Sequence, residues 1–282
     1  MHDDQPSRTA LAAAAHRAAH QTMDAGTIFA DPLARIVLGA DADAIMAIEA
    51  ADPARGRMRM FMAARSRFAE DCIAEAVARG VRQAVVLGAG LDTFALRNPH
   101  RGQGLRVIEV DHPSTQAWKQ DRLAEAGIAV PAEVTFAPAD LQRQDLAAVL
   151  VAAGFQPQQP AFFHWLGVVP YLPREVVAAT LRFIAGLPGS EVVFDYTEPV
   201  ENYPEARRAY IEQLAARVAA VGEPWVTYFD PGALSDELGA LGFDEQEDLG
   251  IVGIAARYPW PFPRQPENGP GPHVIRARRR LD

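Results

Sequence analysis

The sequence contains very little cysteine and lysine. Among its 282 residues there is one cysteine, Cys72, and one lysine, Lys119. A single cysteine excludes an internal disulfide and a zinc site built from several thiolates, and we expect no metal site. Because no G-x-x-x-x-G-K-S/T pattern surrounds the lysine, we exclude both a P-loop and Schiff-base chemistry.

Long apolar runs and an excess of positive charge are also absent. No stretch reaches about 18 consecutive apolar residues, so we expect no membrane span. The net charge of -9 argues against nucleic-acid binding, which needs clustered cations. We interpret the basic run at 276–280 as the solvated edge of a sheet. His16 and Arg17 interrupt the alanine-rich N-terminal stretch, which indicates a helix capped by Ser7 or Thr9 and not a signal peptide. We therefore expect a cytoplasmic protein.

The residues that are abundant predict a globular α/β protein. Apolar residues make up 49% of the sequence, which excludes disorder as the main state. Beyond residue 80, short apolar runs alternate with helical patterns, as is typical of a mostly parallel sheet. The sequence therefore predicts a doubly wound α/β fold in a single domain. The expected strands lie at 84–90, 106–111, 134–141, 161–169 and 191–197.

We expect four segments within this domain. The C-terminal segment contains two further candidate strands, at 249–258 and 273–280. The proline-rich loop between them, 259–272, is expected to be exposed and mobile. The four segments are a helical cap, a cofactor-binding core, a helical insertion after the fifth strand and a group of C-terminal strands, at 1–80, 81–198, 199–230 and 231–282.

A glycine turn follows the first expected strand. Gly88 and Gly90 allow backbone N–H groups to approach a ligand at the carboxyl edge of the sheet. A dinucleotide fingerprint would have Gly or Ala where Thr93 stands, and Asp92 would place a carboxylate beside a pyrophosphate. The turn therefore favours S-adenosylmethionine, which carries positive charge and no phosphate, over NAD or FAD. Asp111 ends the second expected strand, where a carboxylate can accept both ribose hydroxyls. A tight turn with Asp92 as a helix cap explains the same residues and remains an alternative.

Longer motifs extend the comparison to nearly the whole chain. They include SRTALAAAAHRAAH at 7–20, RSRFAED at 65–71, VVLGAGLDTFALR at 85–97, VIEVDHPSTQAWKQDRL at 107–123 and LGVVPYLPREVV at 166–177. In these motifs the sequence resembles the leucine carboxyl methyltransferase and polyketide O-methyltransferase family. The resemblance implies a Rossmann-like class I methyltransferase fold, S-adenosylmethionine as cofactor and a small-molecule acceptor.

The resemblance also implies roles for individual residues. Arg65 resembles the arginine that binds the methionine carboxylate, with Arg67 as second choice because the sequence does not fix the register. Asp140 and Leu141 resemble the pair beside the adenine, where a carboxylate accepts from the exocyclic amine. The full cofactor-binding set that we expect is Arg65, Arg67, Gly88, Gly90, Asp92, Asp111, His112, Asp140 and Leu141.

No residue stands out as a general base. The catalytic candidates are His164, Tyr171 and Tyr196, and many members of the family carry a glutamate where Leu166 stands. A carboxylate acceptor is already ionised at pH 7 and needs no base, whereas a phenol with a pKa near 10 does. The absence of a clear base therefore favours a carboxyl acceptor.

The sequence thus predicts an O-methyltransferase that acts on a carboxylate, or a hydroxyl, of a small aromatic molecule of the polyketide type, within secondary metabolism. Three alternatives stay open: a methyltransferase of protein C-terminal carboxylates, a non-catalytic S-adenosylmethionine-binding protein and a nicotinamide-dependent oxidoreductase. The oligomeric state is not indicated. The aromatic residues that favour a flat acceptor are Tyr196, Tyr203, Tyr210, Trp225 and Tyr228.

Overall fold

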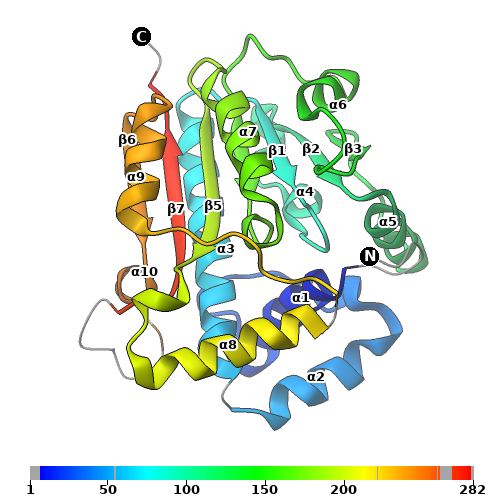
Figure 1. The fold of residues 1–282 in the computed structure, drawn as a ribbon. Helices are drawn as coiled ribbons and strands as arrows, with labels where there is room; N and C mark the ends of the chain where they lie inside the picture. Colours follow the sequence, from blue (N-terminus) through cyan, green and yellow to red (C-terminus); the bar gives the residue numbers. More distant parts are fainter. Residues whose placement is uncertain (1–6, 54, 221, 259, 261–268, 281–282) are drawn as a thin grey trace.

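A seven-stranded, mostly parallel sheet runs through the part of the chain that the structure describes (Figure 1). This computed structural model describes residues 7–53, 55–220, 222–258, 260 and 269–280. The strand order is β3-β2-β1-β4-β5-β7-β6. The strands are β1 Gln83–Leu87, β2 Arg106–Asp111, β3 Val134–Pro138, β4 Phe162–Trp165, β5 Glu191–Thr197, β6 Glu245–Leu249 and β7 Pro272–Arg278.

The strand order confirms the predicted doubly wound sheet. The five strands that the sequence indicated pair in parallel, whereas β7 is antiparallel to both β5 and β6. The chain builds outward from β1 to β2 and β3, then returns to the other side of β1 to form β4 and β5. In such sheets ligands bind beyond the carboxyl ends of the strands at this reversal.

Helices cover both faces of the sheet because successive strand residues point to opposite sides. Val85 and Phe163 pack with α6, α7 and α9, whereas Val86 and Phe162 belong to the apolar cluster that contains α3 and α10. No helix in the described ranges is long and apolar enough to cross a membrane. The helices around the sheet are α3 Arg55–Ala78, α4 Phe94–Arg97, α5 Pro113–Glu125, α6 Leu146–Ala152, α7 Arg174–Ala185, α9 Pro231–Ala240 and α10 Ile251–Arg257, with short 3₁₀ turns η2 Arg101–Gln103 and η3 Val169–Tyr171.

The N-terminal segment forms a separate helical layer. Its first helix begins after Ser7, whose side chain accepts a hydrogen bond from the Ala10 N–H at 3.1 Å, so Ser7 and not Thr9 is the N-cap. Apolar residues of this layer pack on Leu91 and Leu123 in a third core cluster. The layer contains α1 Arg8–Met23, η1 Ile36–Asp41 and α2 Ala42–Ala51.

The helix expected after the fifth strand lies beside the N-terminal layer, as Figure 1 shows for α8 and α1. None of the side chains of α8 is fully buried. The following loop returns to α1, where the Glu223 carboxylate accepts from the N–H groups of Arg8 and Thr9 at 3.0 Å each. The two helices therefore cover the same end of the sheet. This segment contains η4 Val200–Asn202 and α8 Glu205–Ala220.

Two predictions for the C-terminal segment are wrong. The basic run 276–280 is not a sheet edge, because β7 lies between β5 and β6 and acidic neighbours pair with its arginines. Arg276, for example, lies 2.7 Å from Glu191. Most of the run 249–258 is the helix α10, because a short apolar run does not by itself distinguish strand from helix. Most of the proline-rich loop 259–272 lies outside the described residues.

Candidate active site

The glycine turn after β1 has the backbone conformation that the sequence suggested. Gly88 and Gly90 have φ angles of +62° and +48°, which side chains of L-residues rarely adopt. A Cβ at Gly88 would lie 2.3 Å from Cγ2 of Val168, and one at Gly90 would lie 3.0 Å from the Cβ of Ala10. Only glycine fits these two positions without displacement of the neighbouring chain.

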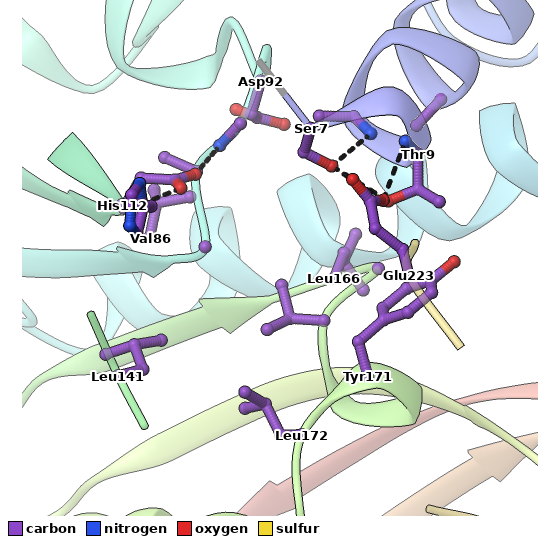
Figure 2. A pocket seen from close by; sticks show the side chains of 18 of the residues that line it. Ser7, Thr9, Val86, Asp92, His112, Leu141, Leu166, Tyr171, Leu172 and Glu223 are labelled. Carbon is purple, nitrogen blue, oxygen red and sulfur yellow. Dashed lines mark hydrogen bonds between the residues drawn. The ribbon is translucent and has the colours of Figure 1, made fainter. Parts of the chain in front are cut away.

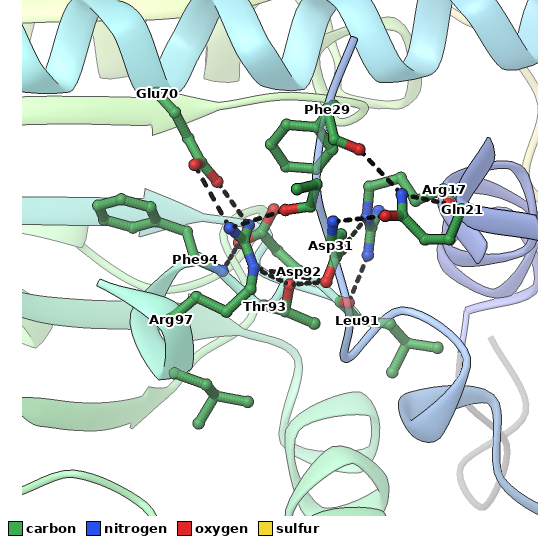
Figure 3. A network of polar contacts seen from close by, with 12 residues as sticks. Arg17, Gln21, Phe29, Asp31, Glu70, Leu91, Asp92, Thr93, Phe94 and Arg97 are labelled. Atoms are coloured by element: carbon green, nitrogen blue, oxygen red, sulfur yellow. Dashed lines mark hydrogen bonds and ion pairs between the residues drawn. The ribbon is translucent and has the colours of Figure 1, made fainter. Parts of the chain in front are cut away.

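A buried polar network joins this turn to the N-terminal helices (Figure 3). Arg17 of α1 donates to the carbonyl of Leu91 at 2.6 Å and to Asp31 at 3.0 Å. Thr93 donates to the other oxygen of Asp31 at 2.7 Å. Our sequence analysis gave Arg17 no role, although an arginine inside an alanine-rich helix is itself a sign of a buried polar contact. The network fixes the position of the turn relative to α1.

The carboxylate of Asp111 lies directly beneath the turn. One of its oxygens accepts the N–H of Gly90, and the other accepts the N–H of His112 at 2.6 Å. Burial raises the pKa of Asp111, and these two N–H groups oppose that rise. Each oxygen keeps a free lone pair, so the carboxylate can still accept hydrogen bonds from a ligand.

A second carboxylate, Asp92, lies in the same turn, one residue before Thr93, the N-cap of α4. Its Oδ1 accepts the N–H of Phe94 at 2.7 Å. Burial would raise the pKa of Asp92, but His164, Arg17, Lys119 and that N–H lower it to about 2. The helix cap is therefore one residue later than the alternative placed it, at Thr93, and the Asp92 carboxylate only accepts from the first N–H of the helix. Its charge still makes the turn unfavourable for a pyrophosphate.

These residues line a cleft of about 620 Å³ at the carboxyl ends of β1, β2 and β4 (Figure 2). Arg67, our second choice for the methionine carboxylate, is not part of the cleft wall. Its side chain is 50% exposed and pairs with Asp71 at 2.7 Å. The residues of the expected set that do line the cleft are Arg65, Gly88, Gly90, Asp92, Asp111, His112, Asp140 and Leu141.

Arg65 is buried in the cleft wall and forms an ion pair with Asp195 of β5. The N–H of Gly167 donates to the same carboxylate. Gly167 has a φ of +75°, and a Cβ there would lie 3.2 Å from Nη2 of Arg65. The Nε of Arg65 has no hydrogen-bond partner among the described residues. The guanidinium is therefore held in place by Asp195 and keeps N–H donors, Nε among them, that no described residue accepts.

A second cavity of about 710 Å³ adjoins the cleft. Its wall is mainly apolar and comes from α1, α3, α8 and the segment before β7. Phe61, Tyr210 and Leu214 are examples, and Tyr228, which we expected among its aromatic residues, is not part of it. We call this cavity the chamber. Five residues line both the cleft and the chamber: Thr9, Ala13, Arg65, Gly167 and Tyr171.

The three catalytic candidates lie in different places. Burial lowers the pKa of His164, which lines the cleft only, so its ring is neutral. Burial raises the pKa of Tyr171, which lines both cavities. Tyr196 lines the chamber and donates to Asp248 at 2.5 Å; burial and this carboxylate raise its pKa. Both phenols therefore stay protonated at neutral pH, and the single O–H of Tyr196 is already donated to Asp248.

Sequence reasoning missed the contact that closes one side of the cleft. Glu223 follows α8 and reaches the start of α1, where Ser7 donates to it at 3.1 Å (Figure 2). The Thr9 hydroxyl donates to the same oxygen. Leu166 also lines the cleft. The only sequence signal for Glu223 was an acid near the end of an expected helix, which is too common to be informative.

Comparisons with known proteins bear on the family and the fold of this chain. The family model described as "Leucine carboxyl methyltransferase" matches residues 10–185. A protein of Bacillus subtilis (strain 168), "Putative S-adenosyl-L-methionine-dependent methyltransferase YktD", is 35% identical over 168 residues, which are 59% of this chain and 55% of that protein. A Mycobacterium avium (strain 104) protein of the same description is 34% identical over 242 residues, 79% of this chain and 76% of its own.

Two solved structures share the fold over almost the whole chain. One is a "putative methyltransferase" from Thermobifida fusca YX, with a TM-score of 0.59 and 18% identity over 99% of this chain and 96% of that chain. The other is a duf574 family protein from Streptomyces avermitilis MA-4680, with a TM-score of 0.58 and 19% identity over 95% and 97%. At this identity the likeness establishes the fold only.

Proposed function

The chain belongs to the leucine carboxyl methyltransferase family of S-adenosylmethionine-dependent methyltransferases, and on this premise we propose that it methylates an oxygen atom of a small, largely apolar acceptor. One observation carries the proposal: the polar cleft and the apolar chamber meet at a common wall. A methyl donor in the cleft and an acceptor in the chamber would face each other there.

The residues of the cleft fit the cofactor. We assign the methionine carboxylate to Arg65, whose Nε is a buried donor without a partner among the described residues. We assign the ribose hydroxyls to Asp111, whose oxygens each retain a lone pair. Asp140 and Leu141 would contact the adenine. The anionic Asp92 is compatible with a sulfonium ligand and unfavourable for a dinucleotide, which disfavours the nicotinamide alternative.

The mechanism that we propose is alignment followed by direct displacement. The cofactor would supply an electrophilic methyl group on its sulfonium. The chain would hold donor and acceptor in contact and in line where the cleft and the chamber meet and would keep water out, which can contribute up to about 7–11 kcal/mol in favourable cases. Tyr171 lines both cavities and stays protonated, so its hydroxyl would donate a hydrogen bond to the acceptor oxygen.

The chamber supports an aromatic acceptor. Tyr196, Tyr203, Tyr210 and Trp225 line it, and aromatic walls suit flat apolar molecules. A small carboxylic acid or a phenol of the polyketide type matches this lining. The acceptor oxygen would then lie near the wall formed by Thr9, Ala13, Arg65, Gly167 and Tyr171.

The first experiment is calorimetric titration of the protein with S-adenosylmethionine, S-adenosylhomocysteine and NAD. We expect micromolar binding of the two sulfur compounds and no binding of NAD. Absence of binding by both sulfur compounds would overturn the cofactor assignment.

The second experiment is incubation with the methyl donor and a panel of aromatic acids, phenols and peptides with free carboxyl termini, with products identified by mass spectrometry. We expect methylated aromatic products. Methylation of the peptides alone would favour a protein carboxyl methyltransferase, and donor binding without any product would favour a non-catalytic protein.

A further inference from the structure

A histidine that our sequence analysis did not consider as a base lies in the wall of the chamber. His16 is on α1, one turn beyond the wall residue Ala13, and is 7% exposed. Its neighbour Arg17 lines the cleft instead. This part of α1 therefore presents one residue to each cavity, and His16 is the one that faces the acceptor side.

A buried carboxylate contacts one edge of the His16 ring. Nδ1 of His16 lies 3.0 Å from Oε2 of Glu49 on α2, and Glu49 is 1% exposed. The contact does not have the geometry of an aligned hydrogen bond, and neither atom has another hydrogen-bond partner among the described residues. The second carboxylate oxygen, Oε1, accepts from Nε of Arg55 at 2.7 Å. Glu49 is thus fixed from one side by Arg55 and meets His16 on the other.

This arrangement sets the ionisation of Glu49 and the tautomer of the His16 ring. Burial would raise the pKa of Glu49, but its contacts with His16 and Arg55 lower it, so the carboxylate stays ionised. An anion beside Nδ1 favours the tautomer with the proton on Nδ1. Nε2, on the opposite edge of the ring, is then the basic nitrogen, and none of the hydrogen bonds among the described residues involves it.

We propose that His16 is the general base of the methyl transfer and that the acceptor is an aromatic hydroxyl. This inference rests on the proposed function and narrows its acceptor from carboxylate or hydroxyl to hydroxyl. A carboxylate would need no base, whereas a phenol with a pKa near 10 must lose its proton as it reacts.

The step balances without a further reactant. As the acceptor oxygen forms its bond to the methyl carbon, the sulfur–methyl bond breaks and its electron pair remains on sulfur, which becomes a neutral thioether. Nε2 of His16 takes the hydroxyl proton, and Glu49 stabilises the imidazolium that results. The proton passes to solvent after the product leaves.

Other charged and titratable groups around the chamber bear on any pH dependence. Arg57 and Arg65 of α3 line the chamber as cations, and Glu49 lies beside His16 as an anion. The complete set to be considered is Glu49 from α2, Arg55, Arg57 and Arg65 from α3, Asp195 and Tyr196 from β5, Tyr171 from η3, Arg207 and Tyr210 from α8, and Tyr203 before it.

The first test needs no acceptor. Long-range ¹H–¹⁵N spectra report the tautomer of each histidine ring, and His16→Gln identifies the signal of His16. We expect the Nδ1–H tautomer in the wild-type protein at neutral pH and its loss in Glu49→Gln. An Nε2–H tautomer in the wild-type protein would overturn the assignment, because the nitrogen away from Glu49 would then carry the proton.

The second test uses two acceptors of one shape, 2-naphthol and 2-naphthoic acid, with S-adenosylmethionine. His16→Gln should slow methylation of 2-naphthol about 10²–10⁴-fold and remove the acidic limb of its pH–rate profile. Donor affinity should be unchanged, as in the control His100→Gln, which alters a loop histidine outside both cavities. Methylation of 2-naphthoic acid alone by the wild-type protein would overturn the assignment of His16 as general base and leave the proposed function intact. Methylation of neither, together with no donor binding, would count against the proposed function itself.

Discussion

The cleft and the chamber are built in different ways. The cleft is polar, and its wall comes from turns at the ends of buried strands, where backbone N–H groups hold the carboxylates of Asp92 and Asp111. The chamber is apolar, and much of its wall comes from α8, none of whose side chains is fully buried. A donor site made from the sheet is constrained by the core, whereas an acceptor site made from peripheral helices can change with little effect on folding.

The largest effect is expected where the two cavities meet. Arg65→Gln leaves the buried Asp195 without its cation and should lower the free energy of unfolding by about 3–5 kcal/mol. Arg67→Gln, two residues away on the exposed side of α3, should change it by less than about 0.5 kcal/mol. Urea denaturation measures both free energies of unfolding. Equal decreases in the two variants would contradict the difference between a buried Arg65 and an exposed Arg67.

The next effect concerns the glycine turn. Gly88→Ala combines a left-handed backbone with a Cβ 2.3 Å from Val168. It should lower the free energy of unfolding by about 2–4 kcal/mol and abolish donor binding. The matched control is Gly80→Ala, which has a φ of +105° but no atom within 4 Å of the new Cβ. Gly80→Ala should lower the free energy of unfolding by about 1–2 kcal/mol and leave donor affinity unchanged. Equal effects in thermal melts would mean that close packing at the turn is unimportant.

A smaller effect is expected for the ribose contact. Asp111→Ala should weaken S-adenosylmethionine binding about 10–100-fold, because hydrogen bonds to a charged group contribute about 1.5–3 kcal/mol. Asp121→Ala alters an exposed carboxylate of α5 outside the cleft and serves as the control. Calorimetric titration compares the two, and unchanged affinity in Asp111→Ala would remove this residue from the donor site.

The contacts of His273 with two carboxylates should make the free energy of unfolding depend on pH. His273 lies 2.9 Å from Asp248 and 3.1 Å from Glu198, and although burial lowers its pKa, these carboxylates raise it above the usual value. The stabilisation is therefore fully present below the unfolded pKa of about 6.5 and is lost as pH rises through the higher folded pKa. His273→Gln should remove about 1 kcal/mol at pH 6 and less at pH 9. A pH-independent difference between the two proteins in denaturant titrations would refute this.

The smallest effect on stability is expected at the outer wall of the chamber. Tyr210 of α8 is 59% exposed yet lines the chamber. Tyr210→Ala should change the free energy of unfolding by less than about 0.5 kcal/mol and leave donor affinity unchanged, while it raises KM for an aromatic acceptor several-fold. A change in donor affinity and none in acceptor KM would reverse the roles assigned to the two cavities.

Local sequence patterns were sufficient for the sheet and for most of the cleft. The five parallel strands are short apolar runs that end in turns, and Gly88, Gly90 and Asp111 follow such runs directly. Their positions are set by neighbours in sequence and by hydrogen bonds between adjacent strands. The C-terminal strands were less predictable, because the arginines of β7 are placed inside the sheet only by partners such as Glu191 and Glu245.

The sequence by itself determined the fold class and the glycine turn and predicted the donor site, because these depend on periodicity and on residues close together in the chain. Only the tertiary structure decided which arginine enters the cleft: Arg65 and Arg67 are about 200° apart on α3, and packing against β5 buries the first. It also brought His16 to Glu49 and to the chamber. Such contacts join separate helices, and the sequence of one helix does not specify which residues of another will face it.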